Sequence, residues 1–417
     1  MNIRNLTVKE QVLEAMRRVY SNALTTTSGG NISAIDENGH IFITPSSIDK
    51  GTLTIDDIVE VLPDGTRIGR HVPSMELPFH SNIYKACPDI KAVVHAHAPA
   101  AVAYACMNIA PDSRCARVYA DALGKIVTTK YALPGSQQLG NIVMQGFRDG
   151  YRTVMMDNHG ATVGAPTMAE ALMKYETLDY LCRTLFHATG LGGATMIGHP
   201  IPLPKEEYSV RPLPADEGKK KEIVAFIRRA YRGQLVGGGW GTLALRDGEG
   251  FLFNPAATAP EDLSEEDVVK CEKGCLSHED SCAYLPLIWE IFAKNPEANA
   301  VFLSMPAATM GFAVANKLMD ARLIPESYIM LKDVVRLPYA ALGNCSQIAG
   351  TLSKKSPAVV IDNECAITIG KNATKAFDRM EVLDYSARSV LLANSVAKIR
   401  PISQKEVDEI DAVFNGW

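Results

Sequence analysis

The chain lacks several features that mark common protein classes. No stretch approaches the ~20 consecutive apolar residues that a membrane-spanning helix requires, and the opening residues 1–7 lack the apolar core of a signal peptide. The nine cysteines include no CxxC pair, and an odd, scattered set is typical of buried thiols in a reducing compartment. We therefore expect a cytoplasmic protein without a membrane span.

An excess of positive charge is also absent. Lys and Arg number 42 against 47 Asp and Glu, which gives a formal net charge of −5, and no basic stripe is visible. Because nucleic-acid binding requires clustered positive charge, we expect no nucleic-acid partner. At 417 residues the chain is too long for one ordinary domain, and two domains of about 200 residues fit the usual size range.

The chemistry centres on the stretch Val93-Val94-His95-Ala96-His97. Its β-branched start and alternating pattern predict a strand over 93–97, so the two imidazoles project from the same face. Such a pair suits metal chelation, although isolated histidines are more often ordinary core or surface residues. Zinc sites with an open coordination position use about three protein ligands, and His159 and Glu76 are the further candidates.

Local patterns place these candidates on secondary structure. The spacing of apolar residues predicts an amphipathic helix over 7–24, and Ser74 is expected to cap a helix over about 76–86. Glu76 and His80 then share one helix face, where we expect His80 to be structural or to support a ligand. A strand over 153–156 delivers His159, and a helix follows over about 167–188.

Glycines and hydroxyl residues near the N-terminus could form an anion pocket. Gly29-Gly30-Asn31 precedes a strand pair over 32–35 and 41–44, and its glycines leave backbone amides free for a ligand. A plain hairpin entry explains the glycines equally well, and the hydroxyls after the second strand are compatible with a turn or with a phosphate contact. The candidate substrate or phosphate ligands are Gly30, Asn31, Ser46, Ser47 and Ser74.

After a proline-rich stretch over 198–214, which reads as an extended linker, the sequence starts again. Residues 231–271 track residues 20–61, 295–301 track 87–93, and 360–363 track 155–158. The pattern indicates a tandem duplication of a unit of about 200 residues. We expect domains over 1–205 and 212–417.

The second copy has lost the candidate site. Leu303 and Met305 stand opposite His95 and His97, Tyr284 opposite Glu76, and Glu364 opposite His159. Joint loss of all four, while the apolar frame persists, indicates that the four served one purpose. The second domain is therefore predicted to be degenerate and metal-free.

The first copy resembles the class II aldolase/adducin family, most closely its L-fuculose-phosphate aldolase branch. The resemblance covers most of residues 7–190. The matching segments are Gly30-Asn31-Ile32-Ser33, Ile43-Thr44-Pro45, Pro73-Ser74-Met75-Glu76, Ala92 to His97 and Asn158-His159-Gly160. It implies an α/β fold made of two three-layer α/β/α domains, each around a largely antiparallel sheet.

The resemblance also implies a site and a reaction. Zinc, or alternatively Mn²⁺ or Co²⁺, would be held by His95, His97 and His159, with Glu76 as acid/base and as a ligand when substrate is absent. The expected reaction is cleavage or formation of a ketose or ketose phosphate, giving a dihydroxyacetone-type product and a small aldehyde. Epimerases of the family carry Asp where this chain has Glu76, which favours an aldolase.

Other activities stay open. Met75 stands where the aldolases usually have a second serine, and Ser47 where a glycine is common, so a substrate with a different phosphate or none is an alternative. An epimerase or dehydratase of the family, or a non-enzymatic adducin-like assembly module, is a further alternative.

The family borrows a tyrosine from a neighbouring subunit, and Tyr119 occupies the matching position. We expect a homo-oligomer, with a dimer forming a pseudo-four-fold ring of alternating copies as one arrangement. In that ring the borrowed tyrosine would be Tyr328, which aligns with Tyr119 in the second copy. An interface tyrosine kept for packing is the alternative for Tyr328.

Overall fold

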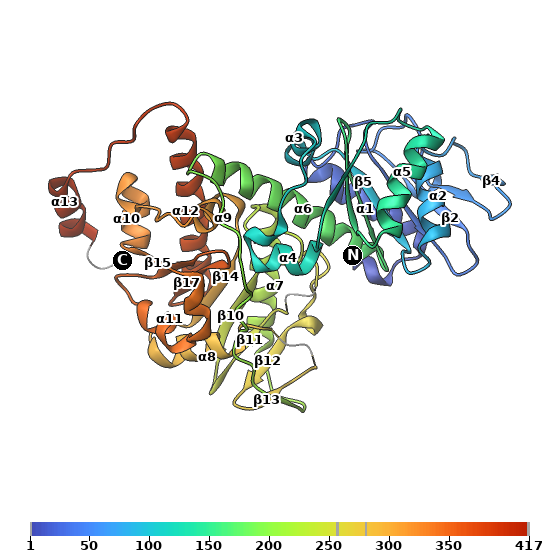
Figure 1. The fold of residues 1–417 in the computed structure, drawn as a ribbon. Helices are drawn as coiled ribbons and strands as arrows, with labels where there is room; N and C mark the ends of the chain where they lie inside the picture. The colour runs from blue at the N-terminus through green and yellow to red at the C-terminus, as the bar shows by residue number, and fades with distance from the viewer. Residues whose placement is uncertain (1, 256–257, 280–281, 415–417) are drawn as a thin grey trace. The chain divides into compact units, whose positions relative to one another are not determined.

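The computed structural model describes residues 2–255, 258–279 and 282–414 (Figure 1). The chain divides into two compact units. The first comprises Met1–Arg114 and Val118–Cys182, and the second comprises Cys115–Arg117 and Arg183–Trp417. The division falls inside helix α6 (Met168–Thr189), ahead of the proline-rich stretch.

The first unit is built around one eight-stranded sheet with the order β4-β3-β2-β1-β5-β8-β7-β6. Neighbouring strands are antiparallel except β6 and β7, which are parallel. The strands are β1 (Asn31–Ile35), β2 (Ile41–Ile43), β3 (Val59–Val61), β4 (Arg67–Ile68), β5 (Ala92–Ala96), β6 (Val127–Thr129), β7 (Thr153–Met156) and β8 (Gly160–Ala165). This confirms the largely antiparallel sheet.

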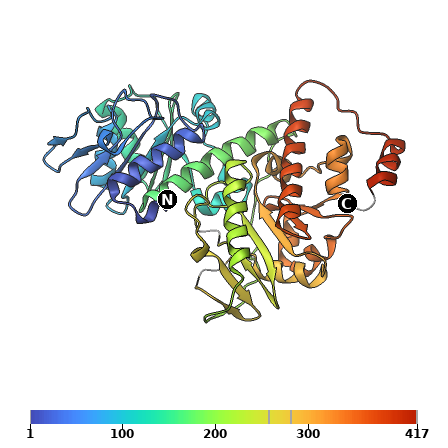
Figure 2. The same cartoon turned by 180° about the vertical axis from the view of Figure 1, so that it is seen from behind.

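Helices cover both faces of this sheet. Helices α2 (Leu77–Ala86) and α5 (Gln137–Arg148) lie on one face, where Phe79 and Phe147 join a core with Val93 and Val154. Figure 2 shows α1 (Val8–Ser21) and α6 together on the other face. The remaining helices are α3 (Pro99–Met107) and α4 (Arg117–Leu123). The three-layer arrangement leaves the β1 and β5 side chains under α2 buried.

The helix starts show where local sequence rules held and where they failed. The helix that the apolar spacing predicts over 7–24 is α1, and Thr7 caps it, because the Thr7 hydroxyl and the Glu10 side chain form a capping box. Ser74 does not cap α2, whose N-cap residue is Glu76. The Ser74 hydroxyl instead accepts from the Glu76 backbone N–H at 3.2 Å. The turn before α2 thereby fixes the backbone of the candidate catalytic carboxylate.

The second unit repeats this topology. Its sheet has the order β15-β16-β17-β14-β10-β11-β12-β13-β9, which from β15 to β13 is the first sheet's order read in reverse. Among the strands of the described residues, the β15–β16 and β13–β9 pairs of this sheet are parallel and the others antiparallel. The strands are β9 (Ser209–Val210), β10 (Thr242–Asp247), β11 (Gly250–Phe253), β12 (Val269–Glu272), β13 (Cys275–Leu276), β14 (Ala300–Ser304), β15 (Val334–Leu337), β16 (Ala358–Ile361) and β17 (Cys365–Gly370).

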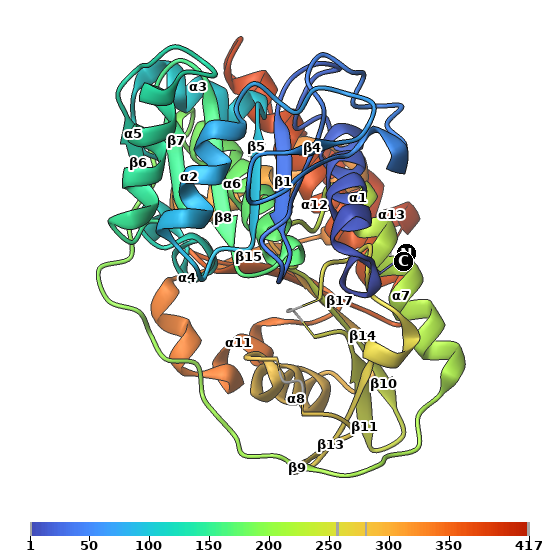
Figure 3. The same cartoon turned by 90° about the vertical axis from the view of Figure 1, so that its right-hand side faces the viewer.

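Helices of the second unit occupy the corresponding places. Figure 3 shows α8 and α11 together beside the β10–β14–β17 part of the sheet. The helices are α7 (Glu217–Arg232), α8 (Leu285–Lys294), α9 (Ala307–Val314), α10 (Pro325–Leu331), α11 (Cys345–Thr351), α12 (Ala373–Asn394) and α13 (Gln404–Phe414). Backbone detail repeats as well, since Asn158 and Asn363 take left-handed φ values of 55° and 56°. Asn158 lies in the turn between β7 and β8, and Asn363 lies in the matching turn between β16 and β17.

The proline-rich stretch is more than a connector. Residues 209 and 210 form β9, which pairs in parallel with β13 and adds a ninth strand to the second sheet. The stretch contains no helix, as its prolines suggest. Across the described residues, no helix has both the length and the apolar character needed to cross a membrane. All nine cysteines are free thiols, and seven of them are buried.

Candidate functional site

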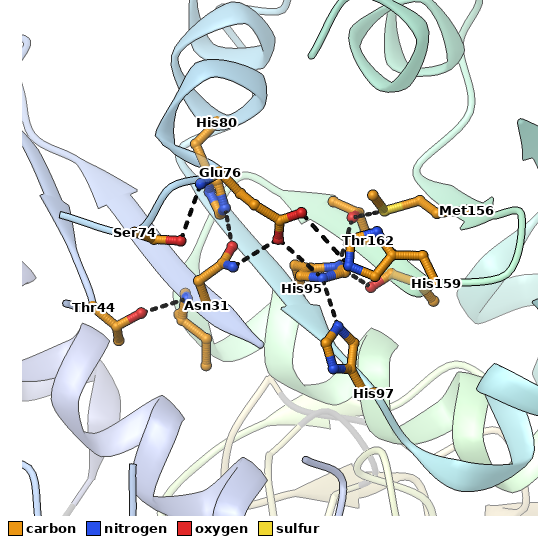
Figure 4. Close-up of polar contacts among 12 residues, drawn as sticks. Asn31, Thr44, Ser74, Glu76, His80, His95, His97, Met156, His159 and Thr162 are labelled. Atoms are coloured by element: carbon orange, nitrogen blue, oxygen red, sulfur yellow. Dashed lines mark hydrogen bonds and ion pairs between the residues drawn. The ribbon is translucent and has the colours of Figure 1, made fainter. Parts of the chain in front are cut away.

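Three histidines meet on the first sheet at the ends of its central strands. His95 lies on β5 beside Asn31 of β1, and His97 directly follows the end of β5. His159 sits in the β7–β8 turn, which the left-handed Asn158 allows to close. The predicted i, i+2 pair and the distant histidine are therefore brought together, as Figure 4 shows.

The ligand atoms of these side chains converge. His95 Nε2 lies 3.0 Å from His97 Nε2, and one ligand atom from each of the three histidines lies within 4.8 Å of the others. The Glu76 carboxylate faces the same point, with Oε2 at 3.2 Å from His95 Nε2 and Oε1 at 3.5 Å from His159 Nε2. Three imidazoles and one carboxylate thus surround one small volume.

Hydrogen bonding and burial give His95 the properties that a metal ligand requires. Its Nδ1–H donates to the Ala161 carbonyl oxygen at 3.0 Å, which leaves the Nε2 lone pair directed at the other histidines. Burial, followed by the neighbouring His97 and His159, lowers the pKa of His95 well below its usual value. Burial and His159 also lower the pKa of His97. Both imidazoles are neutral at pH 7, as metal ligands must be.

Two buried polar atoms of this cluster lack a hydrogen-bond partner in the described part of the chain, which supports the fit of a metal ion here. Glu76 Oε1 and His159 Nδ1 are buried, and neither has a hydrogen-bond partner among the described residues. Buried polar atoms are seldom left unsatisfied without a reason. Three imidazole nitrogens with a nearby carboxylate suit a divalent metal ion with open coordination positions. His95, His97 and His159 could therefore hold a metal ion.

Glycines let the backbone pass close to this cluster. A Cβ on Gly29 would lie 2.9 Å from His97 Nδ1, and one on Gly160 would lie 2.8 Å from the Ala96 carbonyl oxygen. Gly30 combines a φ of +66° with a Cβ position 2.8 Å from the His95 carbonyl oxygen. Packing against the histidine strand therefore accounts for these glycines.

The candidate substrate-binding hydroxyls lie on two paired segments. Pro45 and Pro73 form an antiparallel bridge, flanked by hydrogen bonds from Ser46 N–H to the Val72 carbonyl and from Ser74 N–H to the Thr44 carbonyl. Ser47 takes a φ of +57°, a conformation that favours the glycine common at this position. Met75 is 69% exposed, so its side chain projects into solvent next to Glu76.

Asn31, expected to hold an anion, is engaged by protein groups. Its Nδ2 donates to Glu76 Oε2 at 2.8 Å, and its Oδ1 lies 2.5 Å from His80 Nε2. The i, i+4 spacing of Glu76 and His80 signalled that the two share a helix face. Sequence reasoning missed that Asn31 joins them.

The two tyrosines have different surroundings. Tyr119 lies on α4 and is 2% exposed. Tyr328 lies on α10, and its hydroxyl donates to Asp411 of α13 at 2.8 Å. Burial and this hydrogen bond raise the pKa of Tyr328 to about 12, so it is a protonated phenol at neutral pH.

In the second unit the equivalent positions carry residues with different chemical properties. Tyr284 is the N-cap residue of α8, as Glu76 is of α2, and Leu303 pairs with Thr242 as His95 pairs with Asn31. Glu364 is fully buried in the turn that matches His159. The described residues yield no second cluster of potential metal ligands at these positions.

An arginine reaches this degenerate site. Arg117 Nε donates to Glu364 Oε1 at 3.0 Å and Oε2 at 3.2 Å, and its Nη2 donates to both Glu364 Oε1 and the Tyr284 hydroxyl. The Tyr284 hydroxyl donates to Glu364 at 2.5 Å. A guanidinium cation thus lies where the first unit gathers its imidazoles. Nothing in the local sequence pointed to Arg117.

Comparison with known proteins agrees with the repeated topology of the two units. A model of the "Class II Aldolase and Adducin N-terminal domain" matches residues 10–186 and again residues 221–391. A 5-deoxy-D-ribulose 1-phosphate aldolase of Bacillus thuringiensis is 30% identical over 213 residues, covering 48% of this chain and 91% of the relative. A 3-oxo-tetronate 4-phosphate decarboxylase of Haemophilus influenzae is 26% identical, covering 45% of this chain and 90% of the relative.

One solved structure, described as L-fuculose 1-phosphate aldolase, is 28% identical and covers 46% of this chain and 90% of its own, with a TM-score of 0.43. Each of these relatives spans about half of the present chain, which carries the family domain twice in succession. Their names include lyase activities on sugar phosphates. The chain belongs to the class II aldolase and adducin family.

Proposed function

We propose that the first unit is a zinc-dependent class II aldolase that cleaves or forms a ketose 1-phosphate or a free ketose. The observation that carries the proposal is the convergence of three histidines on Glu76, whose Oε1 is buried without a hydrogen-bond partner among the described residues. A scaffold module has no need of this arrangement, and the second unit of the same chain has dispensed with it.

The chemistry assigns a role to each group. Retro-aldol cleavage of a ketose breaks the C3–C4 bond, removes the proton of the C4 hydroxyl and leaves the electron pair on the C3 side, which must then be protonated. A divalent metal held by His95, His97 and His159 would polarise the C2 carbonyl and stabilise the negative charge that develops there. Glu76, facing the same volume, delivers the proton to C3 and removes it in the reverse reaction.

The proton of the C4 hydroxyl needs a second group. A tyrosine from a neighbouring copy fits this task, and Tyr328, a protonated phenol at neutral pH, is the proposed donor and acceptor. We propose a dimer that forms a ring of four units in which first and second units alternate. Ser46, Ser47 and Ser74 supply hydroxyl donors for the phosphate or another substrate group.

A screen of substrates tests the proposal. The zinc-loaded protein is incubated with ketose 1-phosphates, free ketoses and 3-oxo sugar-acid phosphates, and aldehyde and CO₂ are measured separately. Aldehyde formed together with a dihydroxyacetone-type product supports the aldolase. Release of CO₂ from the oxo acids alone would replace it with the decarboxylase activity carried by one relative's name. Absence of both zinc and turnover would favour an assembly module.

A further inference from the structure

A buried chain of hydrogen bonds runs from the candidate catalytic carboxylate into the core of the first unit. Glu76 Oε2 accepts from Asn31 Nδ2 at 2.8 Å, and Asn31 Oδ1 lies 2.5 Å from His80 Nε2. His80 Nδ1 lies 2.7 Å from the Ser33 hydroxyl, which lies 2.6 Å from the Tyr84 hydroxyl. Figure 4 shows the Glu76, Asn31 and His80 part of this chain.

The chemistry of the groups fixes the direction of every bond. An ionised carboxylate can only accept, so Asn31 presents its NH₂ group to Glu76 and its oxygen to His80. His80 must then carry its proton on Nε2, and its Nδ1 accepts from the Ser33 hydroxyl. Ser33 in turn accepts from Tyr84. Only one tautomer of a neutral imidazole satisfies both neighbours.

Burial makes the direction of these hydrogen bonds matter. His80 and Ser33 are fully buried, and Asn31 is 5% exposed, so water cannot replace a missing partner. The two ends of an amide side chain are nearly the same in shape, and hydrogen bonding decides which end faces Glu76. Without a donor at His80, the Asn31 oxygen would be left unsatisfied at a cost of about 1–3 kcal/mol.

We propose that His80 is a positioning residue for Glu76. Its Nε2–H holds the Asn31 oxygen, which keeps the Asn31 NH₂ group on the carboxylate and the carboxylate oriented toward the reacting carbon. The hydrogen-bond partners of His80 are Asn31 and Ser33, so it acts on Glu76 through Asn31. The inference rests on the proposed role of Glu76 in proton transfer.

Substitution at His80 tests the role. We compare His80→Leu, which removes the donor, with His80→Gln, whose amide can donate to the Asn31 oxygen. Groups that orient a catalytic residue typically contribute about 10–100-fold to activity. We expect His80→Leu to lower kcat by such a factor with KM and zinc content unchanged, and His80→Gln to recover most of it. A loss of zinc, a change confined to KM, or failure of Gln to recover kcat would contradict the proposal.

A double substitution asks whether the effect passes through Asn31. In an Asn31→Ala background, His80→Leu should have little further effect on kcat, because the link is already broken. Additive losses would assign His80 a separate structural role. His40→Gln is the matched control, since His40 is a half-buried histidine of the same unit that pairs with Glu60 on β3. It should leave kcat, KM and zinc content unchanged.

A spectroscopic measurement separates this inference from the proposed activity. In metal-free protein labelled with ¹⁵N-histidine, the signals lost in His80→Gln identify His80, and its two nitrogens report the tautomer directly. We expect a proton on Nε2 and none on Nδ1 at pH 7. A proton on Nδ1 would overturn the proposed hydrogen-bond chain, whether or not the protein has aldolase activity. If the Nε2–H signal is present but the protein has no aldolase activity, the hydrogen-bond chain stands and the proposed activity is rejected.

Discussion

The guanidinium group of Arg117 forms a two-point ion pair with the buried carboxylate of Glu364, at the position where the first unit has His159. Glu364 is fully buried, whereas the Arg117 side chain is 15% exposed. The second unit has therefore exchanged a cluster of neutral ligands for an internal cation and an internal anion. The exchange explains how an acidic side chain can persist in this core.

Arg117→Ala should destabilise the second unit. Removal of one partner from a buried ion pair leaves the other charge uncompensated, and such changes cost about 3–5 kcal/mol. All three tryptophans belong to the second unit, so urea unfolding followed by tryptophan fluorescence reports on it. Arg322→Ala is the control, because the Arg322–Asp320 pair of the same unit is exposed and should contribute less than about 1 kcal/mol. Equal losses in both variants would contradict the role given to Arg117.

Metal binding and proton transfer should separate within the first site. His95→Ala or His159→Ala should abolish both bound zinc and turnover, since each removes a proposed ligand. Glu76→Gln should keep most of the metal and lower kcat by about 10²–10⁴-fold, the usual contribution of a proton-transfer group. Zinc content and kcat, measured on each variant, check both expectations. Stoichiometric zinc in His95→Ala, or an unchanged rate in Glu76→Gln, would reject the corresponding assignment.

Met75→Ser should improve use of phosphorylated over free substrate. The added hydroxyl lies next to Ser74 and can donate to a phosphate oxygen, a hydrogen bond to a charged group that contributes about 1.5–3 kcal/mol. The ratio of kcat/KM for a ketose 1-phosphate and its free ketose is the measurement. Because Met75 is 69% exposed, the replacement should not alter unfolding by urea. No gain, or a loss, would indicate that Met75 serves another substrate group.

If first and second units alternate in the ring, substitutions of the two tyrosines should affect turnover differently. Tyr328→Phe should cripple turnover with zinc and fold intact, whereas Tyr119→Phe should be nearly silent. Asp411→Asn is the matched control, because it weakens the Tyr328–Asp411 hydrogen bond and leaves the phenol in place. If Asp411→Asn reproduces the Tyr328→Phe loss, Tyr328 serves packing against α13. If Tyr119→Phe alone is inactive, first units face each other.

Lys50 should make the stability of the first unit depend on alkaline pH. Lys50 is 2% exposed, its Nζ donates to the Pro45 carbonyl oxygen at 2.6 Å, and burial lowers its pKa from 10.5 to about 8, with Asp49 partly opposing the shift. Between these two values the unfolded chain binds more protons than the folded one, so stability rises with pH.

Lys50→Met lacks this titration and should be more stable than the wild type at pH 7. The difference between the two proteins should then shrink as pH rises from about 8 to 10.5, by at most about 1.4 kcal/mol per pH unit. Urea unfolding followed by far-UV circular dichroism measures it. A difference that does not vary with pH would mean that Lys50 titrates normally in the fold.

Local rules predicted much of the architecture. Alternation placed β5 one residue away from its observed ends, the spacing of apolar residues placed α1, and the loss of four positions in the second copy marked the histidine cluster. Contacts over long sequence separations were invisible to such rules. Asn31 and His80 are 49 residues apart, and Arg117 and Glu364 are 247 apart. Ser74 was wrongly predicted as a cap: its backbone N–H pairs with the Thr44 carbonyl on the neighbouring segment, and α2 begins only after Glu76.

The short strand β9 has a consequence for how this chain behaves among other chains. Ser209 N–H donates to the Gly274 carbonyl at 3.0 Å and Arg211 N–H to the Leu276 carbonyl at 3.1 Å, so the outermost backbone groups of β13 are already paired. An unpaired outer strand is a template for intermolecular sheet growth. β9 thus covers the edge of β13 and is itself only two residues long, and such short edge strands are poor templates for intermolecular pairing.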